Sequence, residues 1–330
     1  MKIIIHTAGG SDIGIGHLVR AHAVAKECEA GGFDVSVIAE MPDEARLRSL
    51  LPKNHIIGGI EEVGKLRSDL VITDRPGLTA ADSSFLRTQG NVFLAHITDY
   101  GRDRFIADLY LDTDQVTQIL FANPKANVLR GYKYTVISDK VKNARPGRAH
   151  CPAKVGQVLV ALGGADPGEL TETFCSAFDW RRLGIQLTAI AGPGWKPDRL
   201  KRFKRVAPDN CTIVYDPGDV TPLMLDADLV VTLGGIMSFE AMCLGRTVAA
   251  LNWRYMGEYV NKFSAQGLLF DLGREISDWK ACFPDLLGDT SAREQITFRG
   301  FNTIDGGAVS RLVEAIMLAH KSASHSQDVN

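Results

Sequence analysis

Short apolar runs alternate with helical patterns along most of this chain of 330 residues. In the first half, the runs are rich in valine, isoleucine and leucine and cover residues 2–6, 35–39, 70–73, 92–97 and 109–111. An amphipathic stretch at residues 16–30 separates the first two runs. Continuous apolar strands separated by helices are typical of a parallel sheet that is covered on both faces. The first half is therefore predicted to form an α/β domain.

A second series of the same kind follows a polar stretch at residues 140–155, with strands expected at 157–162, 187–191, 211–215, 229–233 and 247–251. We interpret the polar stretch as a linker. This predicts an N-terminal Rossmann-like domain at 1–148 and a C-terminal one at 154–322, which suits the length of the chain. Residues 323–330 are polar and are expected to form a disordered tail.

Composition argues against several classes of protein. The formal net charge is −2, which gives no reason to expect a nucleic-acid partner. No apolar run reaches the roughly 18 residues of a membrane-spanning helix, so membrane insertion is not expected. The six cysteines form no CxxC pair, and the eight histidines form no HxxxH or HExxH motif. We expect a cytoplasmic protein with reduced thiols, no metal and no cofactor, as a monomer or a weak dimer.

A glycine-rich turn with a histidine, GGSDIGIGHLVR at residues 9–20, follows the first apolar run. Backbone N–H groups and the helix dipole make such a helix start a favourable site for anionic groups. Gly14 and Gly16 allow a ligand to approach the backbone, and His17 can exchange protons near neutral pH. The alternative is a plain strand-to-helix turn with a buried histidine. A dinucleotide site is weakly supported, because GxGxxG is missing and Glu40 is the only acidic candidate after the second strand.

Glycines also follow strands of the second series, in ALGGADP (161–167) and TLGGIMSFE (232–240). Open α/β sheets bind ligands at the carboxyl ends of their strands. The predicted fold class is therefore α/β, with two Rossmann-like, doubly wound domains that face each other across a cleft.

These segments resemble a known family. The twin α/β domains look like the GT-B fold of nucleotide-sugar enzymes, and IGIGHLVRAHAVAKEC (13–28) resembles the first loop and helix of the UDP-sugar hydrolases of pseudaminic acid biosynthesis. Further similar segments are LRGYKYTVISDKV (129–141), VLVALGGADP (158–167), ADLVVTLGGIMSFEAMCLGRTVAAL (227–251) and IDGGAVSRLVEAI (304–316). Lipid II N-acetylglucosaminyltransferase shares the scaffold more distantly.

The resemblance implies an enzyme that releases UDP from an amino or deoxy sugar by attack of water at the anomeric carbon. The alternative is a GT-B glycosyltransferase that uses a UDP-sugar donor in polysaccharide or glycan biosynthesis. A non-catalytic protein that binds sugar nucleotides is a third possibility.

Roles for individual residues also follow from the resemblance. His17 matches the family's proposed catalytic histidine, which activates the water or orients the sugar. Glu240 matches the carboxylate that accepts hydrogen bonds from the ribose, and Val220 matches the position whose backbone meets uracil. The other residues implied to contact the substrate are Gly14, Gly16, Gly163, Gly164, Gly234, Gly235, Ile236, Met237 and Ser238.

The expected sugar site departs from the family pattern. The family's Asn–Gln pair after the penultimate strand is replaced by a longer segment, in which Asn252 and Asn261 are the only amides. The aromatic residues there, Trp253 and Tyr255, are candidates for stacking on a sugar or for the core. Arg75 stands in a loop where the family tends to present an aromatic residue.

Two weaker signals remain. Asp74, Asp99 and Asp103 follow predicted strands and are candidates for binding sugar hydroxyls. The basic run at residues 196–205 is interpreted as a solvated helix face, with attraction to an acidic acceptor or a membrane surface as the alternative.

Overall fold

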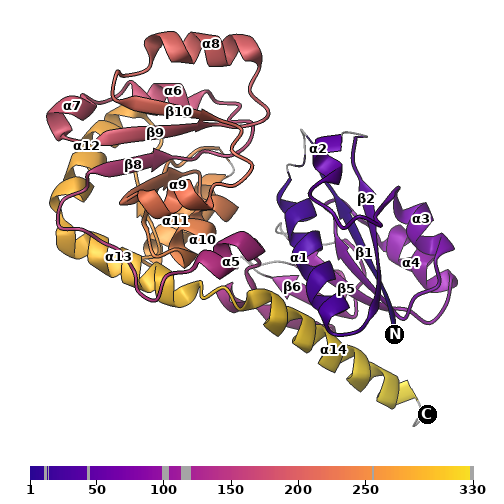
Figure 1. The fold of residues 1–330 in the computed structure, drawn as a ribbon. Coiled ribbons are helices and arrows are strands. Elements are labelled where there is room, and N and C mark those ends of the chain that lie inside the picture. The colour runs from indigo at the N-terminus through magenta and orange to yellow at the C-terminus, as the bar shows by residue number, and fades with distance from the viewer. Residues whose placement is uncertain are drawn as a thin grey trace. The chain divides into compact units, whose positions relative to one another are not determined.

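The computed structural model of the protein describes residues 1–10, 13, 15–42, 45–98, 104–112, 120–254 and 256–327. The chain divides into two units (Figure 1). The first unit comprises Met1–Ser138 and Gly307–Asn330, and the second comprises Asp139–Gly306. The chain therefore passes from the first unit into the second and then returns.

The first unit is built on a seven-stranded sheet of order β3-β2-β1-β4-β5-β6-β7. Every neighbouring pair is parallel, so the carboxyl ends of all seven strands lie at one edge. The strands are β1 (Lys2–Ala8), β2 (Asp34–Glu40), β3 (Ile56–Ile57), β4 (Leu70–Asp74), β5 (Phe93–Thr98), β6 (Leu109–Asp112) and β7 (Asn127–Arg130).

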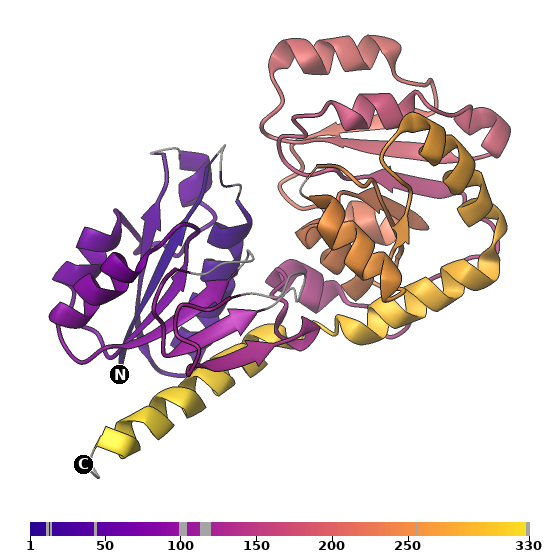
Figure 2. The same ribbon diagram turned by 180° about the vertical axis from the view of Figure 1, so that it is seen from behind.

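One face of this sheet is covered by α1 (Gly16–Ala30) and α14 (Ala308–Gln327). Leu18 of α1 and Ile316 of α14 are fully buried in the same core as Ile3 and Ile5 of β1. Both views show α14 running along the first unit (Figures 1 and 2). The C-terminal helix therefore completes the core that the first 138 residues begin.

The opposite face is covered by α3 (Ile60–Lys65) and α4 (Ala80–Thr88). Val63 and Leu86 of these helices join a core with Ile4 of β1 and Val71 of β4. Successive residues of a strand point to opposite faces, which explains why Ile4 packs under α3 and α4 while its neighbours pack under α1. The unit also contains α2 (Ala45–Arg48) and a short 3-10 helix, η1 (Tyr132–Tyr134).

The second unit is built on a six-stranded parallel sheet of order β10-β9-β8-β11-β12-β13. Its strands are β8 (Gln157–Val160), β9 (Gln186–Ala191), β10 (Cys211–Tyr215), β11 (Leu229–Thr232), β12 (Thr247–Ala250) and β13 (Phe270–Asp271). Its helices are α5 (Asp139–Ala144), α6 (Leu170–Cys175), α7 (Trp180–Leu183), α8 (Pro197–Val206), α9 (Thr221–Asp226), α10 (Ile236–Cys243), α11 (Met256–Ala265), α12 (Ile276–Gly288) and α13 (Thr290–Thr303).

Aromatic side chains fill the core under α6, α7 and α12. The rings of Phe174, Trp180 and Phe283 lie with their centroids 5.5 to 5.8 Å apart. Arg293 of α13 is also fully buried, and its guanidinium donates to the carbonyl oxygens of Leu286 and Ala153 at 2.9 and 2.8 Å. Arg293 therefore links the segment before β8 to the end of α12.

The two doubly wound parallel sheets confirm the predicted fold of both domains. The sequence did not predict β3, β7 and β13, which are edge strands of only two to four residues. No helix within the described ranges is long and apolar enough to cross a membrane.

The division of the chain differs from the predicted boundaries at 148 and 154. The second unit already begins at Asp139, because α5 overlaps the predicted linker and belongs to that unit. The predicted second domain, 154–322, also contains most of α14, which belongs to the first unit. Residues 323–327 of the predicted tail continue α14, and 328–330 lie outside the described residues.

Candidate functional site

The turn after β1 brings His17 to the carboxyl edge of the first sheet. Gly9 donates its N–H to the carbonyl oxygen of Glu40 at 3.0 Å. A Cβ atom on Gly9 would lie 2.4 Å from Leu18 Cδ1, so glycine is needed for α1 to approach the strand this closely. Gly16 begins α1 and places His17 in its first turn. Gly14 lies outside the described residues, so its contact with a substrate stays a prediction.

Asp74, the last residue of β4, holds His17 and Arg20 together. β4 is the neighbour of β1, so its end lies beside the start of α1. Asp74 Oδ1 lies 2.8 Å from His17 Nδ1. Arg20 donates through Nε to Oδ2 and through Nη2 to Oδ1, both at 2.6 Å. The Asp74 side chain is 1% exposed, so these bonds lie in a buried environment.

The protonation of this cluster follows from its charges. Burial raises the pKa of the Asp74 carboxyl, but the Arg20 guanidinium and the hydrogen bond to His17 outweigh burial and hold that pKa well below its usual range. An ionised carboxylate only accepts hydrogen bonds, so His17 Nδ1 carries a proton and donates it to Asp74. Nε2 is then the basic nitrogen of the ring. The cluster can accept a proton at Nε2 and stabilise the resulting imidazolium.

Arg20 Nη2 also lies 3.1 Å from His17 Nδ1. A protonated Nδ1 has no lone pair to offer, so this approach is a contact and not a hydrogen bond. Arg20 therefore acts on the histidine through Asp74, whose two oxygens it fixes. Sequence reasoning did not identify Arg20, although its position one turn after His17 is visible in the helical spacing.

A second carboxylate at the same edge, Glu40, joins His6 and Arg75. Its Oε1 accepts from His6 Nε2 at 3.0 Å, and its Oε2 accepts from Arg75 Nε and Nη2 at 3.1 and 2.9 Å. The hydrogen bond from His6, and then that from Arg75, lowers the pKa of the Glu40 carboxyl against the effect of burial. His6 shares the α3/α4 face with Ile4, whereas Asp74 lies on the α1 face.

Of the three aspartates predicted to bind a sugar, Asp99 and Asp103 lie outside the described residues. Asp74 ends β4, at a strand end as expected, and both of its oxygens accept hydrogen bonds from His17 and Arg20, so its contact with a sugar stays a prediction. Its observed place makes it a partner of the histidine. Asp112 ends β6 in a similar way and accepts from Arg130 Nε at 2.7 Å.

In the second unit, α10 begins after β11 with a glycine pair. Gly234 has a φ of +83°, a conformation that glycine adopts without strain. A Cβ atom there would also lie 2.8 Å from Val260 Cγ2. Gly235 is the N-cap residue, and the hydroxyls of Thr232 and Ser238 lie 2.7 Å apart beneath the turn. The structure therefore brings the residues predicted to bind a diphosphate into one helix start: Gly234, Gly235, Ile236, Met237 and Ser238.

The N–H groups of this helix start are not equivalent. Ser238 already donates its N–H to Gly235 O at 2.9 Å, which differs from its predicted role as a diphosphate donor. The N–H groups of Ile236 and Met237 come before the regular ladder of an α-helix and suit an anion. Glu240 lies four residues after the exposed Ile236 and thus on the same side of the helix; it is 7% exposed.

Gly163 and Gly164 lie in the loop after β8, and this loop is fixed by neighbouring backbone. Gly164 O accepts from Gly194 N at 2.8 Å, and a Cβ atom on Gly192 would lie 2.3 Å from the same oxygen. The glycines therefore allow the loops after β8 and β9 to interlock. A contact of Gly163 and Gly164 with substrate stays a prediction.

Arg199 fixes the same loop from α8. Its Nη2 donates to Asp166 Oδ2 at 2.7 Å and to Glu172 Oε2 at 2.6 Å, and its guanidinium stacks on Trp195. Burial raises the pKa of the Asp166 carboxyl, although the Thr171 N–H and Arg199 oppose this effect. One arginine of the predicted basic run is thus buried, while Lys201, Lys204 and Arg205 are exposed.

The structure also places other predicted residues of the second unit. Val220 is the N-cap residue of α9. The Asn252 amide donates to Asn261 Oδ1 at 2.7 Å and to Asp271 Oδ2 at 3.0 Å, so both amides tie β12 to α11 and β13. Trp253 is half-buried beside Gly168. Tyr255 lies outside the described residues.

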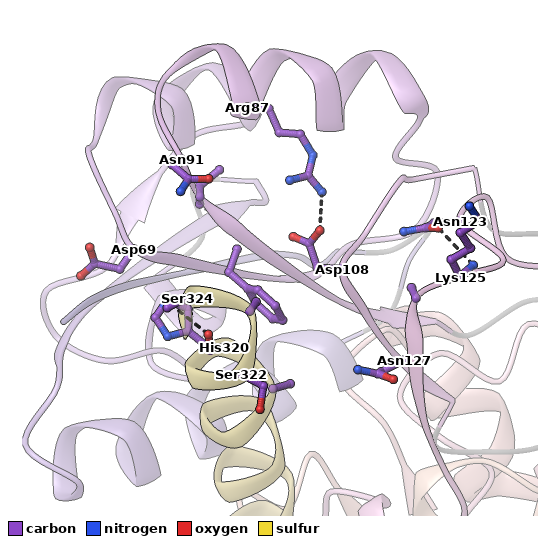
Figure 3. A pocket seen from close by; sticks show the side chains of 15 residues that line it. Asp69, Arg87, Asn91, Asp108, Asn123, Lys125, Asn127, His320, Ser322 and Ser324 are labelled. Atoms are coloured by element: carbon purple, nitrogen blue, oxygen red, sulfur yellow. Dashed lines mark hydrogen bonds and ion pairs between the residues drawn. The ribbon is translucent and has the colours of Figure 1, made fainter. Parts of the chain in front are cut away.

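A hollow of about 410 Å³ lies at the opposite, amino-terminal edge of the first sheet (Figure 3). Several of its polar groups have partners within the unit. Arg87 donates to Asp108 at 2.9 Å, and the Asn123 amide donates to the carbonyl oxygen of Ala107 at 3.0 Å. Asp69 accepts from the N–H of Lys2 at 2.7 Å. These bonds hold the loops before β4, β6 and β7, so the hollow is a poor candidate for the functional site.

No protein-family model matches this chain. The chain is 23% identical over 280 residues to the uncharacterized protein MJ1062 of Methanocaldococcus jannaschii, a match that covers 76% of this chain and only 55% of that protein. It is 22% identical over 294 residues to the spore coat polysaccharide biosynthesis protein SpsG of Bacillus subtilis, which covers 83% of this chain and 84% of SpsG.

Several solved structures share the fold. MurG of Acinetobacter baumannii matches with a TM-score of 0.66 at 14% identity, over 96% of this chain and 99% of MurG. MnaA of S. aureus, solved with UDP, matches with a TM-score of 0.65 at 15% identity, over 94% and 95%. A UDP-N-acetylglucosamine 2-epimerase matches with a TM-score of 0.63 at 14% identity, over 98% and 96%. The chain therefore has the GT-B fold, as the resemblance in sequence predicted.

Proposed function

We propose that this protein is a nucleotide-sugar enzyme that hydrolyses a UDP-sugar, with His17 as the general base. The observation that carries the proposal is the buried Asp74–His17 pair at the start of α1, directly after the glycine turn. A carboxylate that holds Nδ1 and leaves Nε2 basic is the arrangement a general base needs.

In the proposed reaction, His17 Nε2 removes a proton from water as the water oxygen bonds to the anomeric carbon. The bond from that carbon to the phosphate oxygen breaks, and its electron pair leaves with UDP. Asp74 stabilises the imidazolium that forms, and Arg20 keeps Asp74 ionised and oriented. The charge on the departing diphosphate is stabilised by the N–H groups of Ile236 and Met237.

The second unit is proposed to bind the nucleotide, with Glu240 accepting from the ribose hydroxyls and the backbone at Val220 meeting uracil. Two findings support this division. The glycine pair directly precedes the first turn of α10, where backbone N–H groups suit an anion, and MnaA, which shares the fold, was solved with UDP.

A glycosyltransferase is the second candidate, because the same base can deprotonate an acceptor hydroxyl in place of water. The name of SpsG, spore coat polysaccharide biosynthesis protein, favours this alternative. A further solved match is a calicheamicin glycosyltransferase. Chemistry at His17 is the same in both cases, and the acceptor distinguishes them.

The test is incubation of the purified protein with a panel of UDP-, GDP- and CMP-sugars, without an acceptor. Release of UDP with free sugar supports the hydrolase. Release only after a glycan or lipid acceptor is added supports the transferase, and no release with any donor contradicts both.

A variant pair tests the role of the base. His17→Asn should lower turnover by about 10²- to 10⁴-fold, the usual contribution of a positioned proton-transfer group, and should keep its affinity for UDP. His22→Asn is the matched control, since His22 lies on the same helix and its Nδ1 bonds to Leu50 O. Full activity of a folded His17→Asn protein would remove His17 from the mechanism.

A further inference from the structure

Within the described ranges, four residues other than glycine have a positive φ, and all four follow strands at the carboxyl edge of the second sheet. They are Asp166 (φ +40°) and Glu169 (+51°) after β8, Asp216 (+46°) after β10 and Arg254 (+47°) after β12. A left-handed backbone costs energy for a residue with a side chain, less for aspartate than for most others. Such strain collects at functional sites, and Arg254 is the cation among these four residues.

The left-handed backbone of Arg254 is held by contacts on both sides. Gly257 donates its N–H to Arg254 O at 3.0 Å, where α11 begins. The guanidinium carbon lies 4.5 Å from the centroid of the Trp253 ring. That ring packs on Gly168 after β8, where a Cβ atom would lie 2.9 Å from it. Because β11 lies between β8 and β12 in the sheet, a ring that bridges their two loops lies at the end of β11.

The start of α11 also touches the glycine pair that precedes α10. A Cβ atom on Gly235 would lie 3.6 Å from Met256 Cε, and one on Gly234 would lie 2.8 Å from Val260 Cγ2. Arg254 comes two residues before Met256 in the chain. Both the Trp253 ring and α11 therefore place Arg254 at the corner of the sheet where α10 begins.

The helix start of α10 has no cation in its own segment. From Thr232 to Leu244, the one charged residue is the acidic Glu240. The two strained acidic residues after β8 already pair with Arg199 and Arg202, at 2.7 and 2.8 Å. Arg254 is exposed, and its guanidinium has no hydrogen-bond or ion-pair partner among the residues that the structure describes. Its charge is therefore available to an anion at this corner.

The order of the strands gives the direction in which a nucleotide sugar would lie. Val220, the proposed contact of uracil, begins α9, which packs on β8. The proposed diphosphate donors begin α10, which follows β11. The next strand in this direction is β12, and Arg254 follows it. Since base, diphosphate and sugar follow one another in the substrate, Arg254 lies on the side of the β-phosphate and the sugar.

We propose that Arg254 binds the β-phosphate of the nucleotide sugar and stabilises UDP as it departs. The inference rests on the proposed function, because it assumes that UDP lies at the start of α10. When the bond between the anomeric carbon and the β-phosphate oxygen breaks, its electron pair stays on that oxygen. The guanidinium donates to phosphate oxygens through a planar pair of N–H groups, and a cation fixed where charge develops lowers the barrier. The stack on Trp253 holds the guanidinium in place before the substrate binds.

The test compares UDP with UMP, which lacks the β-phosphate, by calorimetry on the full chain. Arg254→Asn removes the cation and introduces a residue that tolerates the left-handed backbone. It should weaken UDP binding by about tenfold or more, the effect of losing a hydrogen bond to a charged group, and change UMP binding by less than about twofold. Arg254→Lys keeps the charge without the planar pair of donors, so it should retain part of the preference for UDP.

Arg181→Asn is the matched control. It removes one positive charge from α7, which leads into the amino end of β9, where Arg181 pairs with Asp209 at 2.8 Å. This variant should leave the affinities for both nucleotides unchanged. If Arg254→Asn weakens UDP and UMP alike, the residue only shapes the loop, and the inference is overturned. Unchanged UDP affinity overturns it as well.

The proposed function can stand while this inference fails. UDP binding that is lost in Glu240→Ala but kept in Arg254→Asn would support the nucleotide site and overturn the role of Arg254. If wild type binds neither UDP nor UMP, the proposed function fails, and this inference fails with it.

Discussion

The substitution Asp74→Asn tests the site and the packing at once. In wild type, Asp74 accepts two hydrogen bonds from Arg20 at 2.6 Å and one from His17 at 2.8 Å. Asparagine has nearly the same shape but no charge. It therefore removes the charge that Asp74 presents to the Arg20 guanidinium, whose side chain is 16% exposed, and it no longer requires Nδ1 of His17 to be the protonated nitrogen.

Burial decides the size of the effect on stability. Removing one partner of a buried ion pair costs about 3–5 kcal/mol, whereas an exposed pair contributes about 0–1 kcal/mol. We therefore expect Asp74→Asn to destabilise the first unit by about 3–5 kcal/mol, which is roughly 10 °C in melting temperature for a unit of this size. Asp108→Asn, which breaks the exposed pair with Arg87, should shift the melting temperature by roughly 2 °C or less.

The stability difference should also depend on pH. The pKa of Asp74 is lowered in the folded state, so its ionised form contributes stability above the unfolded pKa of about 4 and loses that contribution as the pH falls toward the folded pKa. Calorimetric melting of wild type and variant should show the full difference at pH 7 and a smaller one below about pH 4.

Turnover of the folded variant at low temperature should fall by about 10²- to 10⁴-fold, as for loss of the base itself. Two results would refute the reasoning. A melting temperature equal to that of wild type at pH 7 would show that the cluster is not buried and charged as described. Unchanged turnover would show that Asp74 does not orient His17.

Three further predictions follow from other parts of the structure. Glu240→Ala should weaken UDP binding by about tenfold or more, measured by calorimetry, because a charge-assisted hydrogen bond to the ribose is lost; unchanged affinity would remove Glu240 from the site. Gly234→Val should destabilise the second unit by about 1–3 kcal/mol in chemical unfolding, because the valine would have a φ of +83° and a Cβ 2.8 Å from Val260 Cγ2. A variant as stable as wild type would contradict that geometry. Burial raises the pKa of the Cys28 thiol to about 12, so mass spectrometry should find Cys28 unmodified after alkylation of the native protein at pH 8. Rapid modification would show that this side of α1 is not buried.

The sequence indicated His17 as a candidate site residue, but it did not indicate which residues form hydrogen bonds with His17 in the folded protein. His17 follows a glycine turn, which is a local pattern, and the helix at residues 16–30 is observed with those bounds. Its partner Asp74 lies 57 residues away in the chain, and only the placement of β4 beside β1 brings the two together. The strand order of a parallel sheet is set by packing between distant segments, which periodicity does not report.

For the same reason, the observed surroundings of Asn252 and Glu40 differ from those considered from the sequence. Asn252 was considered as an amide near the sugar, but its partners Asn261 and Asp271 come from a helix and a strand that follow later in the chain. Glu40 was considered only for a dinucleotide, because nothing local indicates that Arg75 reaches it across β1. Both cases depend on side chains from three segments that meet only in the folded unit.

The return of α14 to the first unit sets an order on folding during synthesis. The second unit is continuous in the chain and can close as soon as Gly306 has left the ribosome. The core that contains Ile3 and Ile5, which are made first, stays incomplete until Leu312 and Ile316 of α14 are made. At roughly 5–20 residues per second, this wait lasts on the order of ten seconds. A premature stop after Gly306 would therefore spare the unit that is made second and expose the core of the unit that is made first.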